Sequence, residues 1–264
     1  MSVNCINTLA GMEMPSTSDW ALPMLGEIKN QFGERLDYTF HSASKESNTI
    51  VVLGHGVTGN KDRAFLVALA EELAKGGVSV VRFSFSGNGA SGGRFVDSTI
   101  SKEVDDLGAV IESLEDYGRI GYIGHSMGGA VGVLRAARDS RIKFLGSLAG
   151  MVNTKDFAER EFGMVKPGAG FMWDDSNCPL SQAYMDDLRK IGSVAGEASK
   201  IRAPWLLVHG VEDDVVPITD SREIFARANE PKELVEIAGC NHVFAGEGAG
   251  KMIERVRAWI ATLR

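Results

Sequence analysis

The chain has 264 residues, of which 44% are hydrophobic, and this is enough material for the core of a single α/β domain. Its formal net charge is −7 and its Lys and Arg residues are dispersed, so it lacks the basic stripe of a nucleic-acid binder. Neither a signal-peptide pattern nor a run of eighteen apolar residues is present, which predicts a cytoplasmic protein without a membrane partner.

The first predicted elements follow residues 1–25, which we interpret as an N-terminal extension. Two short stretches of alternating side chains lie on either side of a Gly33-Glu34 turn. The alternating positions are Ile28, Asn30 and Phe32 before the turn and Leu36, Tyr38 and Phe40 after it. A period of two around a central glycine predicts an antiparallel hairpin.

From Thr49 onward, short apolar runs alternate with stretches of helical periodicity. The runs read TIVVLG, VSVVRFSF, RIGYIG, KFLGSLAG, PWLLVHG and ELVEIAG. Runs of this kind are typical of strands buried on both faces of a parallel sheet. The clearest helical stripes lie in residues 65–73, 100–114 and 252–263. Alternating strands and helices predict an α/β fold with a mostly parallel, doubly wound sheet.

One interval, residues 151–200, is too long for a single crossover helix and is rich in aromatic residues and methionine. We interpret it as an inserted cap, or lid, on a core formed by residues 26–150 and 201–264. In an open α/β sheet the ligand crevice lies beyond the carboxyl ends of the strands, where a cap would cover it. The alternative is that these side chains pack only against each other, because methionine commonly fills irregular cores.

Two serines match the G-x-S-x-G pattern of a hydrolase nucleophile, Ser91 and Ser126. The motif around Ser126 follows the apolar run RIGYIG directly and leads into the helix-compatible AVGVLRAAR. A nucleophile elbow needs this strand–turn–helix arrangement, and Ser91 has no strand directly before it and no helix directly after it. Ser126 is therefore the predicted catalytic nucleophile.

A serine nucleophile needs a base, and the base needs an orienting acid, in the chain order Ser, acid, His. The run PWLLVHG is followed by Glu212, Asp213 and Asp214, and ELVEIAG is followed by a loop that contains His242. We predict His242 as the base and favour Asp213 as the acid, with Asp214 second. A solvated acidic loop and a surface histidine are the alternatives.

The oxyanion of the reaction needs two backbone donors. The N–H of Met127, at the start of the helix after Ser126, is the first candidate. The glycine-rich corner LGHGVTG follows the first buried strand, and the N–H of Val57 within it is the second. His55 precedes the serine and lies inside this corner, so we interpret it as a structural hydrogen-bonding residue.

The stretch SGNGASGGRF also has the G-x-G-x-x-G spacing of a dinucleotide-binding loop, in Gly87, Gly89 and Gly92. Such a loop opens a helix immediately, whereas helical periodicity resumes here only at Ile100, after a cap at Ser98 or Thr99. The stretch is therefore predicted to connect a strand to a helix near the mouth of the pocket. It predicts no cofactor site.

With HGVTGNKD, RFSFSGNGASGG, GHSMGG, HGVEDDVVP and CNHVF in this order, the chain resembles the α/β-hydrolase superfamily. The resemblance implies an α/β-hydrolase fold, and the family pattern HG-x-x-D-x-x-VP favours Asp213 over Asp214. The corner and the single cap look most like the cinnamoyl and feruloyl esterase-like branch of carboxylesterases. One departure is Ser84, where relatives carry an aspartate that is not a triad member; loop contacts there are expected to differ.

These features predict a serine carboxylesterase that cleaves small to medium apolar or aromatic acyl esters through an acyl-enzyme. A thioesterase, an acyltransferase or a peptidase would keep the same triad, and a ligand-binding protein could keep the same fold. No organic cofactor is expected. The three cysteines, Cys5, Cys178 and Cys240, show neither disulfide nor zinc-site spacing, so no metal is expected either. The partner is a small-molecule ester, and nothing in the sequence indicates a homo-oligomer.

Overall fold

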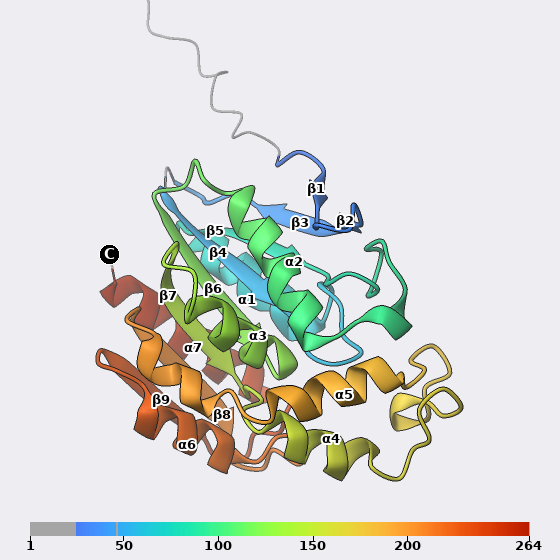
Figure 1. The fold of residues 1–264 in the computed structure, drawn as a ribbon. Coiled ribbons are helices and arrows are strands. Elements are labelled where there is room, and N and C mark those ends of the chain that lie inside the picture. The colour runs from blue at the N-terminus through green and yellow to red at the C-terminus, as the bar shows by residue number, and fades with distance from the viewer. Residues whose placement is uncertain (1–24, 46, 264) are drawn as a thin grey trace, which may run out of the picture.

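The computed structural model describes residues 25–45 and 47–263, so the predicted N-terminal extension lies almost entirely outside the described residues. The larger sheet has seven strands in the order β3-β5-β4-β6-β7-β8-β9 (Figure 1). The strands are β1 (Ile28–Lys29), β2 (Arg35–Leu36), β3 (Tyr38–His41), β4 (Thr49–Gly54), β5 (Ser79–Phe83), β6 (Arg119–His125), β7 (Ile142–Leu148), β8 (Trp205–Gly210) and β9 (Lys232–Ile237).

Helices connect the parallel strands, as the sequence periodicity predicts. The α-helices are α1 (Ala64–Lys75), α2 (Ile100–Glu112), α3 (Met127–Ala136), α4 (Thr154–Phe162), α5 (Gln182–Ile191), α6 (Ile218–Arg227) and α7 (Glu247–Thr262), and the short 3-10 helices are η1 (Phe95–Asp97), η2 (Met172–Asp174) and η3 (Ala195–Lys200). None of the helices in the described ranges combines the length and the apolar character that a membrane crossing requires.

The predicted N-terminal hairpin is present but shorter than its sequence pattern. Strands β1 and β2 pair antiparallel, with Ile28 opposite Leu36. Tyr38 and Phe40 belong instead to β3, which pairs antiparallel with β5 at one edge of the larger sheet. The chain changes partner at Asp37, whose carbonyl oxygen accepts a hydrogen bond from the Ser84 N–H at 2.9 Å.

Strands β4 to β9 run parallel to one another, and the burial of each strand follows its place in the sheet. Strands β4, β5, β6 and β8 are buried almost throughout, as the apolar runs predict. The prediction is wrong for β9, where Glu233 and Glu236 are exposed and only Ile237 is buried. Strand β9 is the edge of the sheet, and an edge strand has a neighbour on one side only.

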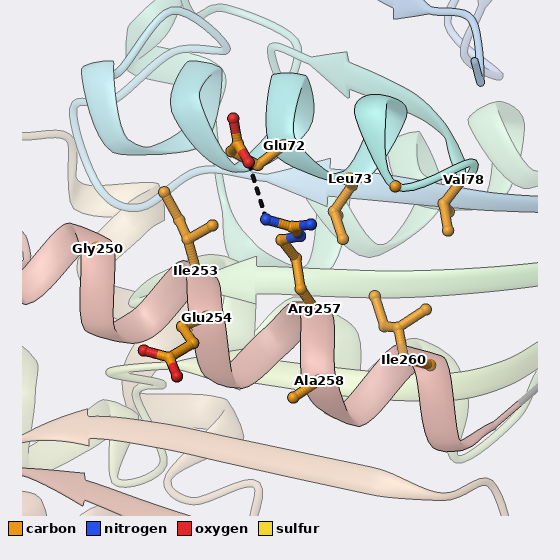
Figure 2. A pocket seen from close by; sticks show the side chains of 11 residues that line it. Glu72, Leu73, Val78, Gly250, Ile253, Glu254, Arg257, Ala258 and Ile260 are labelled. Carbon is orange, nitrogen blue, oxygen red and sulfur yellow. Dashed lines mark hydrogen bonds and ion pairs between the residues drawn. The ribbon is translucent and has the colours of Figure 1, made fainter.

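Helices cover both faces of the sheet (Figure 1). Helices α1 and α7 contribute to one buried apolar cluster, and α2, α3, α4, α5 and α6 contribute to the other. Between α1 and α7, the Arg257 guanidinium bonds the Glu72 carboxylate at 2.9 Å, beside a surface cavity of about 660 Å³ (Figure 2). This cavity has none of the predicted site residues in its lining.

The 151–200 segment lies between β7 and β8 and contains α4, η2, α5 and η3. Phe157, Phe162 and Tyr184 are fully buried in the same apolar cluster as α2 and α3, so they do not pack only against each other. On the surface of α5, the Asp187 carboxylate accepts hydrogen bonds from the Ser101 hydroxyl at 2.6 Å and the Ser101 N–H at 3.0 Å. This contact ties the segment to the start of α2.

Candidate active site

Ser126 occupies a sharp turn between β6, which ends at His125, and α3, which begins at Met127. Its φ is 54° and its ψ is −120°, a strained conformation for a residue other than glycine. The turn needs glycine at position 124, because a Cβ there would lie 2.1 Å from the Gly128 carbonyl oxygen. The strand–turn–helix arrangement around Ser126 is thus the one that the sequence predicts.

Asp213 and His242 come together from the loops after β8 and β9. The Nδ1 atom of His242 lies 2.8 Å from Oδ2 of Asp213, whereas Asp214 is exposed. Gly210 allows this approach, since a Cβ at that position would lie 2.2 Å from the carbonyl oxygen of Cys240. Because Nδ1 faces a carboxylate, it carries the proton, and Nε2 of His242 is left free to accept one.

The side chain of Asp213 is fully buried, yet it stays ionised. Burial alone raises its pKa, but hydrogen bonds from His209, His242 and the Val216 N–H outweigh that effect and lower the pKa well below its usual range. Its Oδ1 accepts the N–H groups of Val215 at 2.9 Å and Val216 at 2.8 Å. A permanent negative charge therefore faces the His242 ring.

His209 is a neighbour of Asp213 that the sequence analysis missed. Its Nε2 lies 3.2 Å from Asp213 Oδ2 and 2.9 Å from the Val216 carbonyl oxygen, and two acceptors require a proton on this nitrogen. Its Nδ1 then accepts the Ser221 hydroxyl proton at 2.7 Å. The only sequence signal for this contact is the histidine in the HG-x-x-D motif.

His125, directly before the serine, was also missed. Its Nε2 lies 2.9 Å from the carbonyl oxygen of His242, and the two imidazole centroids are 4.7 Å apart. Burial, together with the nearby His242, lowers the pKa of His125 to about 3, so the ring is neutral and Nε2–H donates to the carbonyl. This bond fixes the loop that carries His242 to the end of β6.

The corner after β4 lies directly against Ser126. A Cβ on Gly56 would lie 2.8 Å from Ser126 Cβ and 3.2 Å from Ser126 Oγ, so only glycine leaves space there. Within the described part of the chain, the N–H groups of Val57 and Met127 donate no hydrogen bond. Two free donors next to a serine hydroxyl have the composition of an oxyanion hole.

His55 holds this corner in place, as predicted for a structural residue. Its Nε2 accepts the Phe85 N–H at 3.0 Å, and its Nδ1–H donates to the Gly56 carbonyl oxygen at 2.8 Å. The side chain is completely buried, and this burial lowers the pKa of His55 to about 4. A neutral imidazole that bonds two backbone groups stabilises the corner.

An open cleft of about 320 Å³ lies over these groups. Ser126, His125 and His242 form part of its lining, together with Phe65, Arg63, Val215 and, from the 151–200 segment, the half-exposed Trp173. The sequence analysis had grouped Trp173 with the other apolar residues of the segment. Only the fold shows that Trp173 faces the cleft while Phe162 and Tyr184 do not.

The connection from β5 to α2 contains no second elbow and no dinucleotide loop. The Ser91 hydroxyl donates to the Ser84 carbonyl oxygen at 2.7 Å and accepts the Asp37 N–H at 2.8 Å, so it has a structural role. The helix begins at Ile100, and the side chain of Thr99 caps it by accepting the Lys102 N–H at 3.2 Å. The hydroxyl of Ser84, the position where the sequence departs from the expected family pattern, accepts the Lys61 N–H at 3.1 Å.

Residues able to bind metal do not cluster in the described residues. In residues 25–45 and 47–263, no three His, Cys, Asp or Glu side chains converge as metal ligands would. Cys178 and Cys240 are buried free thiols, and Cys5 lies outside the described residues.

Comparisons with known proteins give one consistent group of relatives. Residues 45–166 match the family model described as serine aminopeptidase, S33. The monoacylglycerol lipase of Mycolicibacterium smegmatis is 26% identical over 265 residues, which cover 87% of this chain and 94% of the lipase. An uncharacterized protein of Mycobacterium tuberculosis is 29% identical over 219 residues, which cover 81% of this chain and 70% of that protein.

Among solved structures, Est1E from Butyrivibrio proteoclasticus with bound ferulic acid is similar to this chain with a TM-score of 0.78. The two sequences are 25% identical, and the match covers 89% of this chain and 98% of Est1E. The monoacylglycerol lipase of Paleococcus ferrophilus matches with a TM-score of 0.70 at 21% identity, over 86% of this chain and 98% of the lipase. The sheet order, the turn at Ser126 and these matches show that the chain has the α/β-hydrolase fold.

Proposed function

We propose that this α/β-hydrolase cleaves carboxylic esters through a Ser126–His242–Asp213 triad. The observation that carries the proposal is the 2.8 Å bond between His242 and the ionised Asp213, in the cleft where Ser126 sits on its strained turn. This bond fixes the tautomer in which Nε2 of His242 can act as a base. Ser126 and His242 both line this cleft, which supports the proposal.

The reaction has two acyl-transfer steps. His242 Nε2 takes the Ser126 hydroxyl proton while Oγ bonds the ester carbonyl carbon, and the N–H groups of Val57 and Met127 bind the oxyanion. The C–O bond to the alcohol then breaks, and the alcohol leaves with the proton from His242. Water, activated by His242 in the same way, releases the acid and restores Ser126. Asp213 stabilises the protonated imidazole in both steps.

The cleft lining favours esters with an apolar or aromatic group. Phe65, Trp173, Val215 and Val243 provide apolar surface around Ser126. The ferulic acid in the Est1E structure and the lipase name of the mycobacterial relative are in keeping with such substrates. The acyl group and the alcohol would both contact this surface, so we assign it to recognition of the ester as a whole.

An aminopeptidase, the activity in the name of the matched family model, is a weaker candidate. Such an enzyme must bind a protonated α-amino group, which requires a carboxylate near the scissile bond. Among the described residues that line the cleft, none is Asp or Glu, and Arg63 is a cation that would repel an ammonium group. The ester therefore remains the preferred substrate class.

The test compares 4-nitrophenyl acetate with alanine 4-nitroanilide on purified protein. We expect turnover of the ester with little or no turnover of the anilide. Ser126→Ala should abolish ester turnover and leave the thermal unfolding midpoint nearly unchanged, because the hydroxyl makes no hydrogen bond within the described residues. Efficient anilide cleavage, or ester turnover by Ser126→Ala, would contradict the proposal.

A further inference from the structure

A second and much smaller cavity of about 10 Å³ shares two lining residues with the cleft, Val57 and Thr58 of the corner after β4. Val57 and Met127, whose N–H groups are the proposed oxyanion donors, belong to its lining, so the cavity lies beside the proposed oxyanion site. Glu103 of α2 and Tyr184 of α5 also line it. A space of this size takes one water-sized group.

Three other polar side chains around this cavity already have partners. Ser98 Oγ donates to the Ser86 carbonyl oxygen at 2.8 Å, and Ser181 Oγ accepts the Tyr184 N–H at 3.1 Å. Asn88 Nδ2 donates to Ser86 O at 3.2 Å. These groups shape the wall of the cavity and do not need a ligand to satisfy them.

Glu103 differs from these neighbours. The residue is only 1% exposed, and its Oε2 atom has no hydrogen-bond partner among the described residues. A buried polar atom without a partner costs free energy and calls for an explanation. Among the residues that the structure describes, the Tyr184 hydroxyl on the same cavity wall has only a 3.8 Å contact to the sulfur of Met127, which is a weak acceptor.

The environment of Glu103 favours the neutral form of its carboxyl group. Burial is the main cause that raises its pKa well above the ordinary value, and the negative charges of Asp106 and Asp187 add to it while Lys102 opposes it. A neutral carboxyl group can donate a hydrogen bond as well as accept one. The Glu103 carboxyl group and the Tyr184 hydroxyl could therefore each form a hydrogen bond with one hydroxyl group in the cavity.

We propose that this cavity selects an acyl group with a hydroxyl on its short chain, held by Glu103 Oε2 and the Tyr184 hydroxyl. The inference rests on the proposed function, because the cavity meets the acyl chain only if Val57 and Met127 bind the ester oxygen. A methyl group at the same place would keep Oε2 without a partner, whereas a hydroxyl satisfies it. The preferred substrates are therefore esters of short hydroxy acids.

The experiment measures kcat/KM for 4-nitrophenyl butyrate and for both enantiomers of 4-nitrophenyl 3-hydroxybutyrate. We expect wild type to prefer one hydroxylated ester by about five- to tenfold, the effect of one additional neutral hydrogen bond. Glu103→Leu should abolish this preference, and Glu103→Gln should retain part of it. Glu112→Leu, which removes an exposed carboxylate from the same helix, is the matched control and should leave the preference unchanged.

The shorter 4-nitrophenyl acetate separates this inference from the proposed function. Acetate carries no hydroxyl on its acyl chain, so both wild type and the control Glu112→Leu should hydrolyse it. If acetate is hydrolysed and the preference for the hydroxylated ester is absent, or is unchanged in Glu103→Leu, the cavity does not select hydroxyl groups and only this inference is overturned. If acetate is not hydrolysed by wild type, the proposed function fails and the inference fails with it.

Discussion

Asp213 is the residue on which the candidate site is centred. Its two oxygens accept hydrogen bonds from two backbone N–H groups and from two histidines, His209 and His242. These donors explain how a fully buried carboxylate keeps its charge, because each bond favours the ionised form. One negative charge is thus held in place against the imidazole of His242.

Replacing this carboxylate is predicted to reduce catalysis without unfolding the protein. Asp213→Asn should lower kcat/KM for 4-nitrophenyl acetate by a factor on the order of 10⁴, because the amide no longer fixes the Nδ1–H tautomer of His242. Asp214→Asn is the matched control, since Asp214 is exposed next to it, and should change kcat/KM by less than about twofold. Equal effects of the two substitutions would contradict the role given to Asp213.

The buried histidines make stability depend on pH. The folded protein keeps the pKa of His55 at about 4 and that of His125 at about 3, whereas an unfolded histidine titrates near 6.5. Their stabilising contribution is therefore present above pH 6.5 and is lost as the pH falls below it. Each should lower the free energy of unfolding by about 2 kcal/mol between pH 7 and pH 5.

Urea unfolding at these two pH values tests this, with His125→Gln as the variant that cannot titrate. The glutamine can still donate to the His242 carbonyl, so the protein should fold. Its loss of stability between pH 7 and pH 5 should be smaller than that of wild type by about 2 kcal/mol. An identical loss in both proteins would mean that His125 is not held neutral by the fold.

At the level of single residues, the sequence analysis identified those candidates that follow a predicted strand and occur in the expected chain order. The order Ser126, Asp213, His242 and the strand ends before them predicted three side chains that the fold brings to one end of the sheet. The contacts of His125 and His209 were not predicted, because they depend on which strands become neighbours. No periodicity in the chain reports the strand order, in which β6 and β8 lie on either side of β7 and β9 lies next to β8.

At the scale of elements, α3 depends on glycine to lie close to the sheet. A Cβ on Gly132 would lie 2.5 Å from the ring of Tyr122 on β6, and one on Gly128 would lie 2.6 Å from the His55 carbonyl oxygen. The close approach places the first N–H groups of α3, with their partial positive charge, next to Ser126. Glycine in a helix interior lowers the intrinsic stability of α3. The same glycines allow the helix to lie close to the sheet.

Two glycine-to-alanine changes in helices test this difference. Gly132→Ala should destabilise the protein by about 1–3 kcal/mol, because the added methyl group overpacks the Tyr122 ring. Gly250→Ala in α7, where no atom lies within 4 Å of the new Cβ, should stabilise it by up to about 1 kcal/mol. Chemical denaturation gives both values, and the same sign for both would contradict the packing argument.

The elements that were predicted best are those whose buried side chains are apolar. The apolar runs that form β4, β6 and β8 predicted strands, whereas α6 was not predicted, because its buried face includes Asp220 and Ser221. These side chains bond the Val152 N–H at 2.8 Å and Nδ1 of His209 at 2.7 Å, so polar contacts take the place of an apolar stripe. The edge position of β9 likewise follows from strand order and not from its composition.

At the scale of the whole molecule, the 151–200 segment and the sheet share one core. Phe157, Phe162 and Tyr184 belong to the apolar cluster that also contains residues of β4, β6 and α2. We proposed a cap here from the length of the interval, and the shared core implies that such a cap does not fold alone. The protein should therefore unfold as one cooperative unit.

Calorimetry of two phenylalanine variants in this segment measures the coupling. Phe162→Ala removes a fully buried ring and should destabilise the protein by about 3–5 kcal/mol, lowering the midpoint of a single transition. Phe171→Ala, whose ring is 40% exposed, is the matched control and should shift the midpoint much less. A second, earlier transition in Phe162→Ala would show that the segment unfolds independently of the sheet.

The most direct test of the account is the intact mass of the protein after treatment with a fluorophosphonate. This reagent reacts with an activated serine whatever the natural substrate is. We predict one adduct on wild type and on Ser91→Ala, whose serine lies in the other G-x-S-x-G match, and none on Ser126→Ala. A folded wild type without an adduct, or an adduct that persists in Ser126→Ala, would contradict the assignment of Ser126 as the nucleophile.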